Sequence, residues 1–340
     1  MLTYRYAHEV MLECGVVLPE LTVAYHTYGK LNPESDNVIW ICHALTANAD
    51  VMQWWPGVVG QQAVFDTDKY FIVCANILGS CYGSTGPLSV NPLSGAPYYL
   101  SFPPVTIRDM VKAHALLAEE LGVKQIYLLA GGSMGGYQAI EWSVFEPGFI
   151  KQLYLIATSA QESAWGIAIH AAQRLAIEAD YTWADLSAGA GKKGLQAARA
   201  IGMLTYRSYE TYAITQAESG TEKLDEFRAS SYINYQGHKL ANRFNAHSYW
   251  LLTKAMDSHN IGRGRNASVA EVLQRLTART LIIGITSDLL CPVAEQRFMS
   301  EHIPHNNFIQ IDSLYGHDGF LVETAAIIPH LRAWLEGANS

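Results

Sequence analysis

The stretch GGSMGG, residues 131–136, decides the fold because it sets Ser133 among glycines in the pattern G-x-S-x-G. An apolar run at residues 125–130 (QIYLLA) comes directly before it and predicts a buried strand, and residues 133–145 predict a helix. A serine on a tight strand-to-helix turn exposes its hydroxyl, and flanking glycines are needed there because side chains would collide. The alternative is a glycine-rich turn that binds phosphate or nothing. The downstream residues described below favour a nucleophilic serine.

The residues around this motif alternate between predicted strands and helices. In chain order these elements are strands at residues 21–28, 37–45 and 70–78, a helix at 106–121 and, beyond the motif, a strand at 151–157. Most of the strands are near-continuous apolar runs, which are typical of strands covered on both faces. The alternation therefore predicts a mostly parallel sheet with helices on both faces.

The alternation stops at about residue 161 and resumes at about residue 270. The segment between contains no convincing buried strand but has helical patterns at residues 164–179, 194–204, 231–240 and 246–256. Beyond it, strands are predicted at residues 280–286 and 307–311 and a last amphipathic helix at 322–335. We therefore predict one α/β core domain, residues 1–160 and 270–340, that carries an inserted helical lid domain, residues 161–269.

A nucleophilic serine needs a histidine as its base and a carboxylate that orients the histidine. Asp288 follows the strand predicted at residues 280–286, and His317 follows the strand predicted at residues 307–311. Both residues thus lie on loops after late strands, in the chain order serine, acid, histidine that goes with this serine turn. The sequence predicts a catalytic triad of Ser133, Asp288 and His317.

Competing acids and histidines fit the triad less well. Asp312 is too close in sequence to His317 to lie on the loop of a separate strand. His302 and His305 precede their strand and so belong at its opposite edge. We expect both histidines to be ordinary surface residues.

The oxyanion of an acyl-transfer reaction needs two N–H donors. The backbone N–H of Met134, directly after the serine at the start of a helix, is the first candidate. The second is expected on the loop after an early central strand, where residues 37–42 run into His43-Ala-Leu45, and the N–H of Leu45 is the candidate. His43 itself is expected to pack against the serine turn, without a catalytic role.

Composition excludes several classes of protein. The chain has 340 residues, of which 49% are hydrophobic and 16% charged, so it can bury a large core and has no disordered composition. Its formal net charge is 23 − 31 = −8, without a basic run. An acidic surface repels nucleic acids and anionic membranes, so neither is expected as a partner.

Cysteine usage and hydropathy predict a cytoplasmic protein. The five cysteines, Cys14, Cys42, Cys74, Cys81 and Cys291, are scattered and form no CxxC pair, so reduced and mostly buried thiols are expected. No Cys/His cluster has the spacing of metal ligands, so no metal is expected. We also find no leader pattern near the N-terminus and no apolar run long enough to span a bilayer.

With these residues in place, the sequence resembles the homoserine O-acetyltransferase family of α/β hydrolases over nearly its whole length. The resemblance therefore implies the α/β-hydrolase fold. The matching segments, in chain order, are residues 18–25 (LPELTVAY), 27–32 (TYGKLN), 43–46 (HALT), 83–87 (GSTGP), 106–110 (TIRDM), 131–142 (GGSMGGYQAIEW), 204–208 (LTYRS), 235–237 (YQG), 284–288 (GITSD) and 315–324 (YGHDGFLVET).

The resemblance also implies three substrate-binding residues. Arg199, eight positions before Arg207, matches the lid arginine that receives the homoserine carboxylate. Asp318 matches the acid that holds the substrate amino group, and Tyr206 matches a lid tyrosine near the acceptor. The planar guanidinium group matches the geometry of a carboxylate. Without the family resemblance, Arg199 would be interpreted as an ordinary charged residue on a helix face.

The implied activity is acetyl transfer from acetyl-CoA to L-homoserine through an acyl-Ser133 intermediate, as a step of methionine biosynthesis, with acetyl-CoA as substrate and no permanently bound cofactor. A homodimer through the lid helices is also implied. Several alternatives stay open: succinyl-CoA as donor, serine as acceptor, an esterase that uses water, or an inactive hydrolase fold that only binds. Departures from the family pattern at Tyr82, Asn48 and Asp50, on loops near the expected entrance, bear on the choice of acyl donor.

Overall fold

The computed structural model describes residues 1–337, and its centre is an eight-stranded sheet with the strand order β1-β4-β8-β5-β9-β10-β11-β12 among these residues. From β8 to β12 all neighbouring strands are parallel, whereas the pairs β1·β4 and β4·β8 are antiparallel. The strands span Leu2–Tyr6 (β1), Leu21–Tyr28 (β4), Val38–Cys42 (β5), Phe71–Ala75 (β8), Ile126–Gly132 (β9), Ile150–Ile156 (β10), Arg279–Ile285 (β11) and Asn306–Ile311 (β12).

Strand β5 shows why the central strands are apolar throughout. Val38, Trp40 and Cys42 belong to the hydrophobic core on one face of the sheet, and Ile39 and Ile41 belong to the core on the other face. Successive side chains of a strand point to opposite faces, so a strand between two cores needs apolar residues at every position.

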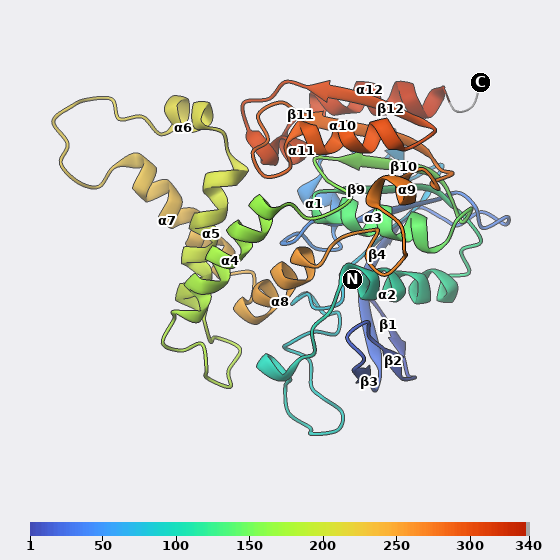
Figure 1. Ribbon diagram of the computed structural model, residues 1–340, viewed down its shortest axis with the longest axis horizontal. Helices are drawn as coiled ribbons and strands as arrows, with labels where there is room; N and C mark the ends of the chain where they lie inside the picture. The colour runs from blue at the N-terminus through green and yellow to red at the C-terminus, as the bar shows by residue number, and fades with distance from the viewer. Residues whose placement is uncertain (338–340) are drawn as a thin grey trace.

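Helices cover both faces of the sheet, as Figure 1 shows. One core includes residues of α2, α3, α9 and α10, and the other includes residues of α1, α11 and α12. These helices span Ile107–Glu120 (α2), Met134–Phe145 (α3), Val269–Leu273 (α9), Val293–His302 (α10), Val51–Trp54 (α1), Gly319–Val322 (α11) and Thr324–Glu336 (α12). The α/β-hydrolase fold expected from the sequence is thereby confirmed.

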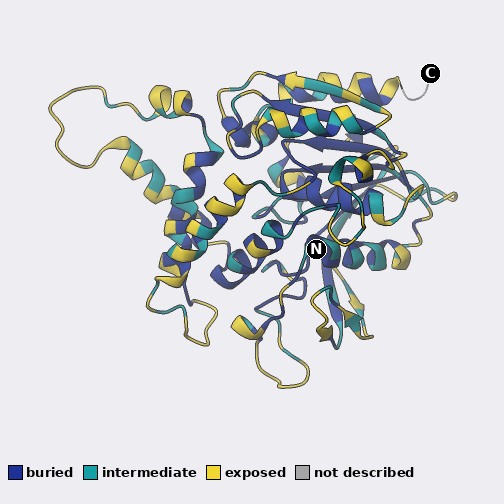
Figure 2. Cartoon of the chain, in the orientation of Figure 1, coloured by how far each residue is buried: buried dark blue, intermediate teal, exposed yellow. Residues whose placement is uncertain are grey.

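Five helices occupy the chain between β10 and β11 and stand to one side of the sheet in Figure 1. They are α4 (Ala164–Glu178), α5 (Lys192–Tyr206), α6 (Tyr209–Thr215), α7 (Arg228–Ala241) and α8 (Ala246–Asp257). Helix α5 packs against both α4 and α7, and the outer helices are more exposed than the sheet (Figure 2). We propose that they form the lid domain of residues 161–269; residues 338–340 of the proposed core range lie outside the described residues.

The predicted strands and long helices agree with the structure to within a few residues at their ends. Predictions were missing for β1, for α10 and for the short helices α1, α6, α9 and α11. They were also missing for two small ladders, β2 (Val10–Met11) with β3 (Val17–Leu18) and β6 (Val59–Gly60) with β7 (Phe65–Asp66). Within residues 1–337 no helix is long and apolar enough to cross a membrane.

Close packing of α3 against the end of β5 holds the serine turn in place. A Cβ atom at Gly135 would lie well inside contact distance of the carbonyl oxygen of Cys42, and one at Gly131 would overlap the backbone of Gly135. Only glycine allows the helix to start this close to the strand ends.

We predict that Gly135→Ala lowers the free energy of unfolding by about 2 kcal/mol or more, because backbone has to move to accept the methyl group. Urea unfolding followed by circular dichroism measures the change. The matched control is Gly189→Ala, since Gly189 has open space around the position of a Cβ. Equal unfolding midpoints for the two variants would contradict the packing described above.

Candidate active site

Ser133 lies on the turn between β9 and α3 in a backbone conformation that side chains rarely adopt. Its φ is 54° and its ψ is −130°, and its N–H donates a hydrogen bond to the carbonyl of Ile156 at 3.1 Å. Such strain persists only where the surroundings enforce it, and it is typical of a nucleophile turn. The turn lifts the hydroxyl above the carboxyl end of the sheet, next to the loops that follow β11 and β12.

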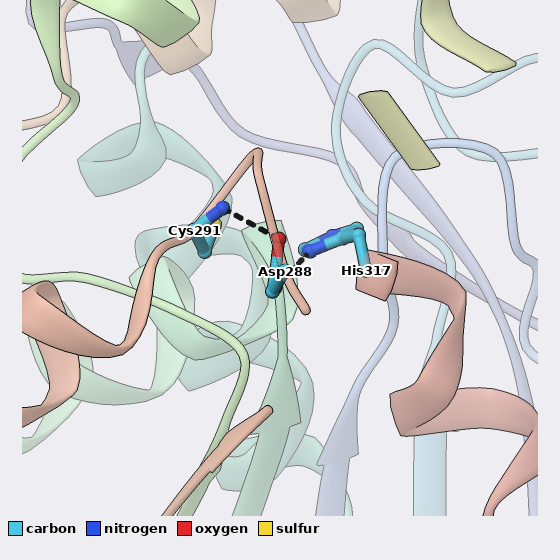
Figure 3. Close-up of side chains that lie close together, drawn as sticks. All are labelled: Asp288, Cys291 and His317. Carbon is cyan, nitrogen blue, oxygen red and sulfur yellow. Dashed lines mark hydrogen bonds and ion pairs between the residues drawn. The ribbon is translucent and has the colours of Figure 1, made fainter. Parts of the chain in front are cut away.

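Those two loops bring His317 and Asp288 to the serine. The Nε2 atom of His317 lies 2.8 Å from Oγ of Ser133, and its Nδ1 atom lies 2.7 Å from Oδ2 of Asp288. The other carboxylate oxygen of Asp288 accepts the backbone N–H groups of Leu290 and Cys291, each at 2.8 Å. Figure 3 shows the carboxylate between the imidazole and the backbone of Cys291. Both oxygens of Asp288 are therefore occupied, and the carboxylate is held in one orientation.

The partners of His317 define its tautomer. With Nδ1–H donated to the carboxylate, Nε2 is left as the acceptor for the hydroxyl proton of Ser133. Burial lowers the pKa of His317, but the charge and hydrogen bond of Asp288 outweigh burial, so the pKa lies above the ordinary 6.5. This arrangement favours an imidazole that takes the serine proton and is stabilised as the imidazolium.

The two N–H groups expected to face an oxyanion are free in the structure. Among residues 1–337, neither the N–H of Met134 nor that of Leu45 donates a hydrogen bond. Buried His43 fixes the loop that carries Leu45. Its Nε2 accepts the N–H of Ile77 at 3.3 Å, and its Nδ1 lies 2.8 Å from the carbonyl of Ala44.

This imidazole orients a donor without touching the substrate. The Ala44 carbonyl and the Leu45 N–H belong to one planar peptide unit, so a bond to the former aims the latter. Burial lowers the pKa of His43 to about 4, which keeps it neutral and able to accept from Ile77.

A cavity of ≈ 470 Å³ opens above Ser133. It is lined by triad residues Ser133 and His317, by the loop at Leu45, and by Arg199, Tyr206 and Asp318. The structure thus brings together at one cavity all three substrate-binding candidates, of which Arg199 and Tyr206 lie on α5 and Asp318 directly follows His317. A larger groove of ≈ 610 Å³, between α2 and the N-terminal residues, contains none of them.

Arg199 is a cation without a counterion. The guanidinium lies 4.9 Å from the ring centre of Tyr206, and within residues 1–337 it has no carboxylate at ion-pair distance. The ring of Tyr206 lies 5.9 Å from that of His317. An unpaired arginine beside the triad can receive a carboxylate in a bidentate manner.

Asp318 has a partner that the sequence did not reveal. Nε of Arg207, at the end of α5, lies 3.0 Å from the Asp318 carboxylate. The pair links the lid helix to the histidine loop and leaves the second carboxylate oxygen available for a ligand. The only sequence signal for this ion pair is that Arg207 lies in a segment, LTYR, that matches the family.

Cys291 is a further neighbour that sequence reasoning did not place. Potential ligand atoms of Asp288, Cys291 and His317 lie within 4.8 Å of one another. Burial, followed by the charge of Asp288, raises the pKa of the Cys291 thiol well above its ordinary value. The thiol is thus held neutral, and the imidazole and carboxylate are already bonded to each other, which makes the cluster a poor metal site.

The competing residues lie away from the triad. Asp312 is exposed, and His305 is exposed at the start of β12, the edge of the sheet opposite to His317. His302, the last residue of α10, bonds to the carbonyl of Phe298.

Known proteins resemble this chain in sequence and in fold. The family model described as alpha/beta hydrolase fold matches residues 37–324. A homoserine O-acetyltransferase of Cyclobacterium marinum is 48% identical over 319 residues, 94% of this chain and 90% of the relative. The crystal structure of homoserine O-acetyltransferase from Bacillus anthracis has a TM-score of 0.90 at 25% identity, covering 98% of this chain and 97% of the other. The crystal structure of esterase E22 has a TM-score of 0.85 at 22% identity, covering 98% of this chain and 100% of the esterase, and this similarity shows the fold alone.

We predict that activity falls as the pH is lowered through the raised pKa of His317, because only the neutral imidazole can accept the Ser133 proton. Asp288→Asn keeps an oxygen for the two N–H groups but removes the charge that raises this pKa. The variant should lose about 10⁴-fold in rate, by analogy with other serine triads, and its inflection should move to lower pH.

The pH profile of kcat/KM measures both effects. An inflection that stays in place after Asp288→Asn would mean that another group governs the profile.

Proposed function

Because the chain belongs to the homoserine O-acetyltransferase family of α/β hydrolases, we propose that it transfers an acetyl group from acetyl-CoA to the hydroxyl of L-homoserine. The observation that carries this proposal is the unpaired Arg199 in the cavity of Ser133 and His317. An esterase that hydrolyses simple esters does not need a cation in this cavity. An amino-acid acceptor, in contrast, brings a carboxylate that such a cation binds.

In the first half-reaction, His317 takes the proton of Ser133 while the serine oxygen attacks the thioester carbonyl. The carbonyl oxygen becomes an oxyanion, which the free N–H groups of Leu45 and Met134 stabilise; losing one such donor costs about 100- to 1000-fold in other enzymes. The C–S bond then breaks, the His317 proton goes to the sulfur, and CoA leaves an acetyl ester on Ser133. No metal or bound cofactor takes part in the proposed steps.

In the second half-reaction, homoserine replaces CoA. Arg199 binds its carboxylate, Asp318 accepts a hydrogen bond from its ammonium group, and Tyr206 forms the wall beside His317. The hydroxyl gives its proton to His317 and attacks the acetyl ester, and the proton returns to Ser133 as O-acetylhomoserine forms. The acceptor prevails over water when the cavity holds it at a high effective concentration beside the ester.

We predict that CoA release from acetyl-CoA depends on homoserine and vanishes in Ser133→Ala. A thiol reagent follows the release, with serine as a second acceptor and succinyl-CoA as a second donor. Fast release without any acceptor would mean that water is the second nucleophile, and the esterase would take the place of the transferase.

The variant Arg199→Gln tests acceptor binding separately from the chemistry of the triad. The ratio of transfer to homoserine over hydrolysis should fall by about tenfold or more, since a charge-assisted bidentate contact is lost. Lys192→Gln is the matched control, because Lys192 lies on the same helix, exposed and away from the cavity. Equal ratios for the two variants would contradict the role of Arg199.

We further propose a cytoplasmic homodimer that forms through the lid helices. Large apolar side chains are exposed on these helices, among them Leu175, Leu204, Ile214 and Tyr235. Leu204 is 61% exposed and does not line the cavity, so its side chain is free to contact a partner subunit. Light scattering should give twice the 37.5 kDa chain mass, and Leu204→Glu with Leu175→Glu should shift it toward the monomer. A monomeric parent protein would contradict the dimer.

A further inference from the structure

The outer end of the active-site cavity is basic. The lining residues that are exposed are Gln53, Lys239 and Arg243, and we call this part of the cavity the mouth. Lys239 lies in the last turn of α7, and Arg243 follows four positions later, just beyond the helix end. Both side chains line the same cavity, so both cations face the same opening.

The positive charge at the mouth is not compensated. Within residues 1–337, neither Lys239 nor Arg243 has a carboxylate at ion-pair distance. The cavity lining contains the three cations Arg199, Lys239 and Arg243 but only one carboxylate, Asp318, which is already paired with Arg207. In a chain with a net charge of −8, such a local excess of positive charge attracts anions to this opening.

Arg243 is fixed in position and still has donors to spare. Its Nη1 donates to the carbonyl of Thr46 at 2.5 Å and to the hydroxyl of Tyr82 at 2.8 Å, and Nη2 lies 3.5 Å from Oγ1 of Thr46. A guanidinium has five N–H donors, so Nε–H and one N–H of Nη2 are left over. The ammonium group of Lys239 makes no hydrogen bond to the described residues, and it lies 6.0 Å from the ring centre of Tyr235.

We propose that Lys239 and Arg243 bind phosphate groups of the acyl-CoA donor at the mouth of the cavity. The proposal rests on the proposed function and adds to it the site of donor recognition. In an acyl-CoA the thioester and the phosphates lie at opposite ends of the pantetheine arm. When the thioester carbonyl is at Ser133, the phosphates therefore have to lie outside the buried part of the cavity, where these two cations are.

Arg243 also contacts Thr46, on the loop that carries Leu45. Thr46 directly follows Leu45, whose N–H faces the oxyanion, so the residue that binds the donor also anchors the donor-activating loop to the lid. Among the described residues, the ammonium group of Lys239 has no hydrogen bond to that loop, so its substitution separates phosphate binding from loop anchoring.

The experiment compares two acetyl donors in the full-length protein with homoserine as acceptor: acetyl-CoA and S-acetyl-N-acetylcysteamine, which carries the same thioester without phosphates. We expect the kcat/KM ratio of acetyl-CoA over the short thioester to fall about threefold in Lys239→Gln and about tenfold in Lys239→Gln/Arg243→Gln, because exposed charge pairs each contribute modestly. Lys239→Arg, which keeps the charge, should restore the ratio.

Lys192→Gln and Arg275→Gln are the matched controls, since both side chains are exposed and outside the cavity lining. They should leave the ratio as in the parent protein. A ratio that also stays unchanged in the double variant would overturn phosphate binding at the mouth while acetyl transfer stands. Failure of the parent protein to use either donor would overturn the proposed function, and this inference with it.

Discussion

The backbone strain at Ser133 is the constraint on which the rest of the structure depends. A residue with a positive φ and a side chain is costly, and here it is enforced from several sides: the N–H bonds to Ile156, and the flanking glycines let α3 start against the ends of β9 and β5. The same turn exposes the hydroxyl and frees the N–H of Met134. A relaxed turn would lose the nucleophile and half of the oxyanion site together.

The parallel sheet brings the remaining groups to this turn. Strands β5, β9, β11 and β12 run in the same direction, so the loops after them meet at one edge. Those loops carry Leu45, Ser133, Asp288 and His317, in that order. The segment between β10 and β11 then supplies Arg199, Tyr206, Lys239 and Arg243, which line the cavity above the triad. The sheet thus positions the triad, and the helical segment contributes the groups that we propose bind the two substrates.

The parts of this arrangement that were predictable from sequence are those with a local signal. The glycine pattern around Ser133 and the apolar runs before Asp288 and His317 carry such a signal, and the structure places the three side chains in hydrogen-bond contact. Helix α10 was missed because polar Gln296 is a main buried contact, bonded to the Thr158 carbonyl, which hides the apolar periodicity. Strand β1 is an exposed edge strand with little apolar burial.

Local sequence patterns could not predict side-chain contacts between distant parts of the chain. Arg207 with Asp318 and Arg243 with Thr46 join the segment between β10 and β11 to the loops around Ser133, and the second pair is separated by 197 positions. The roles proposed for Arg199, Asp318 and Tyr206 rest on the family resemblance, because nothing in their sequence neighbourhoods distinguishes them from surface residues.

The central claim is that the acetyl group passes through Ser133. Mass spectrometry of the protein after brief mixing with acetyl-CoA alone tests it most directly. We predict a mass increase of one acetyl group, located on the peptide that contains Ser133, which disappears when homoserine is added while O-acetylhomoserine forms. An unmodified Ser133 peptide together with product formation would contradict the account, because the acetyl group would then pass directly from donor to acceptor.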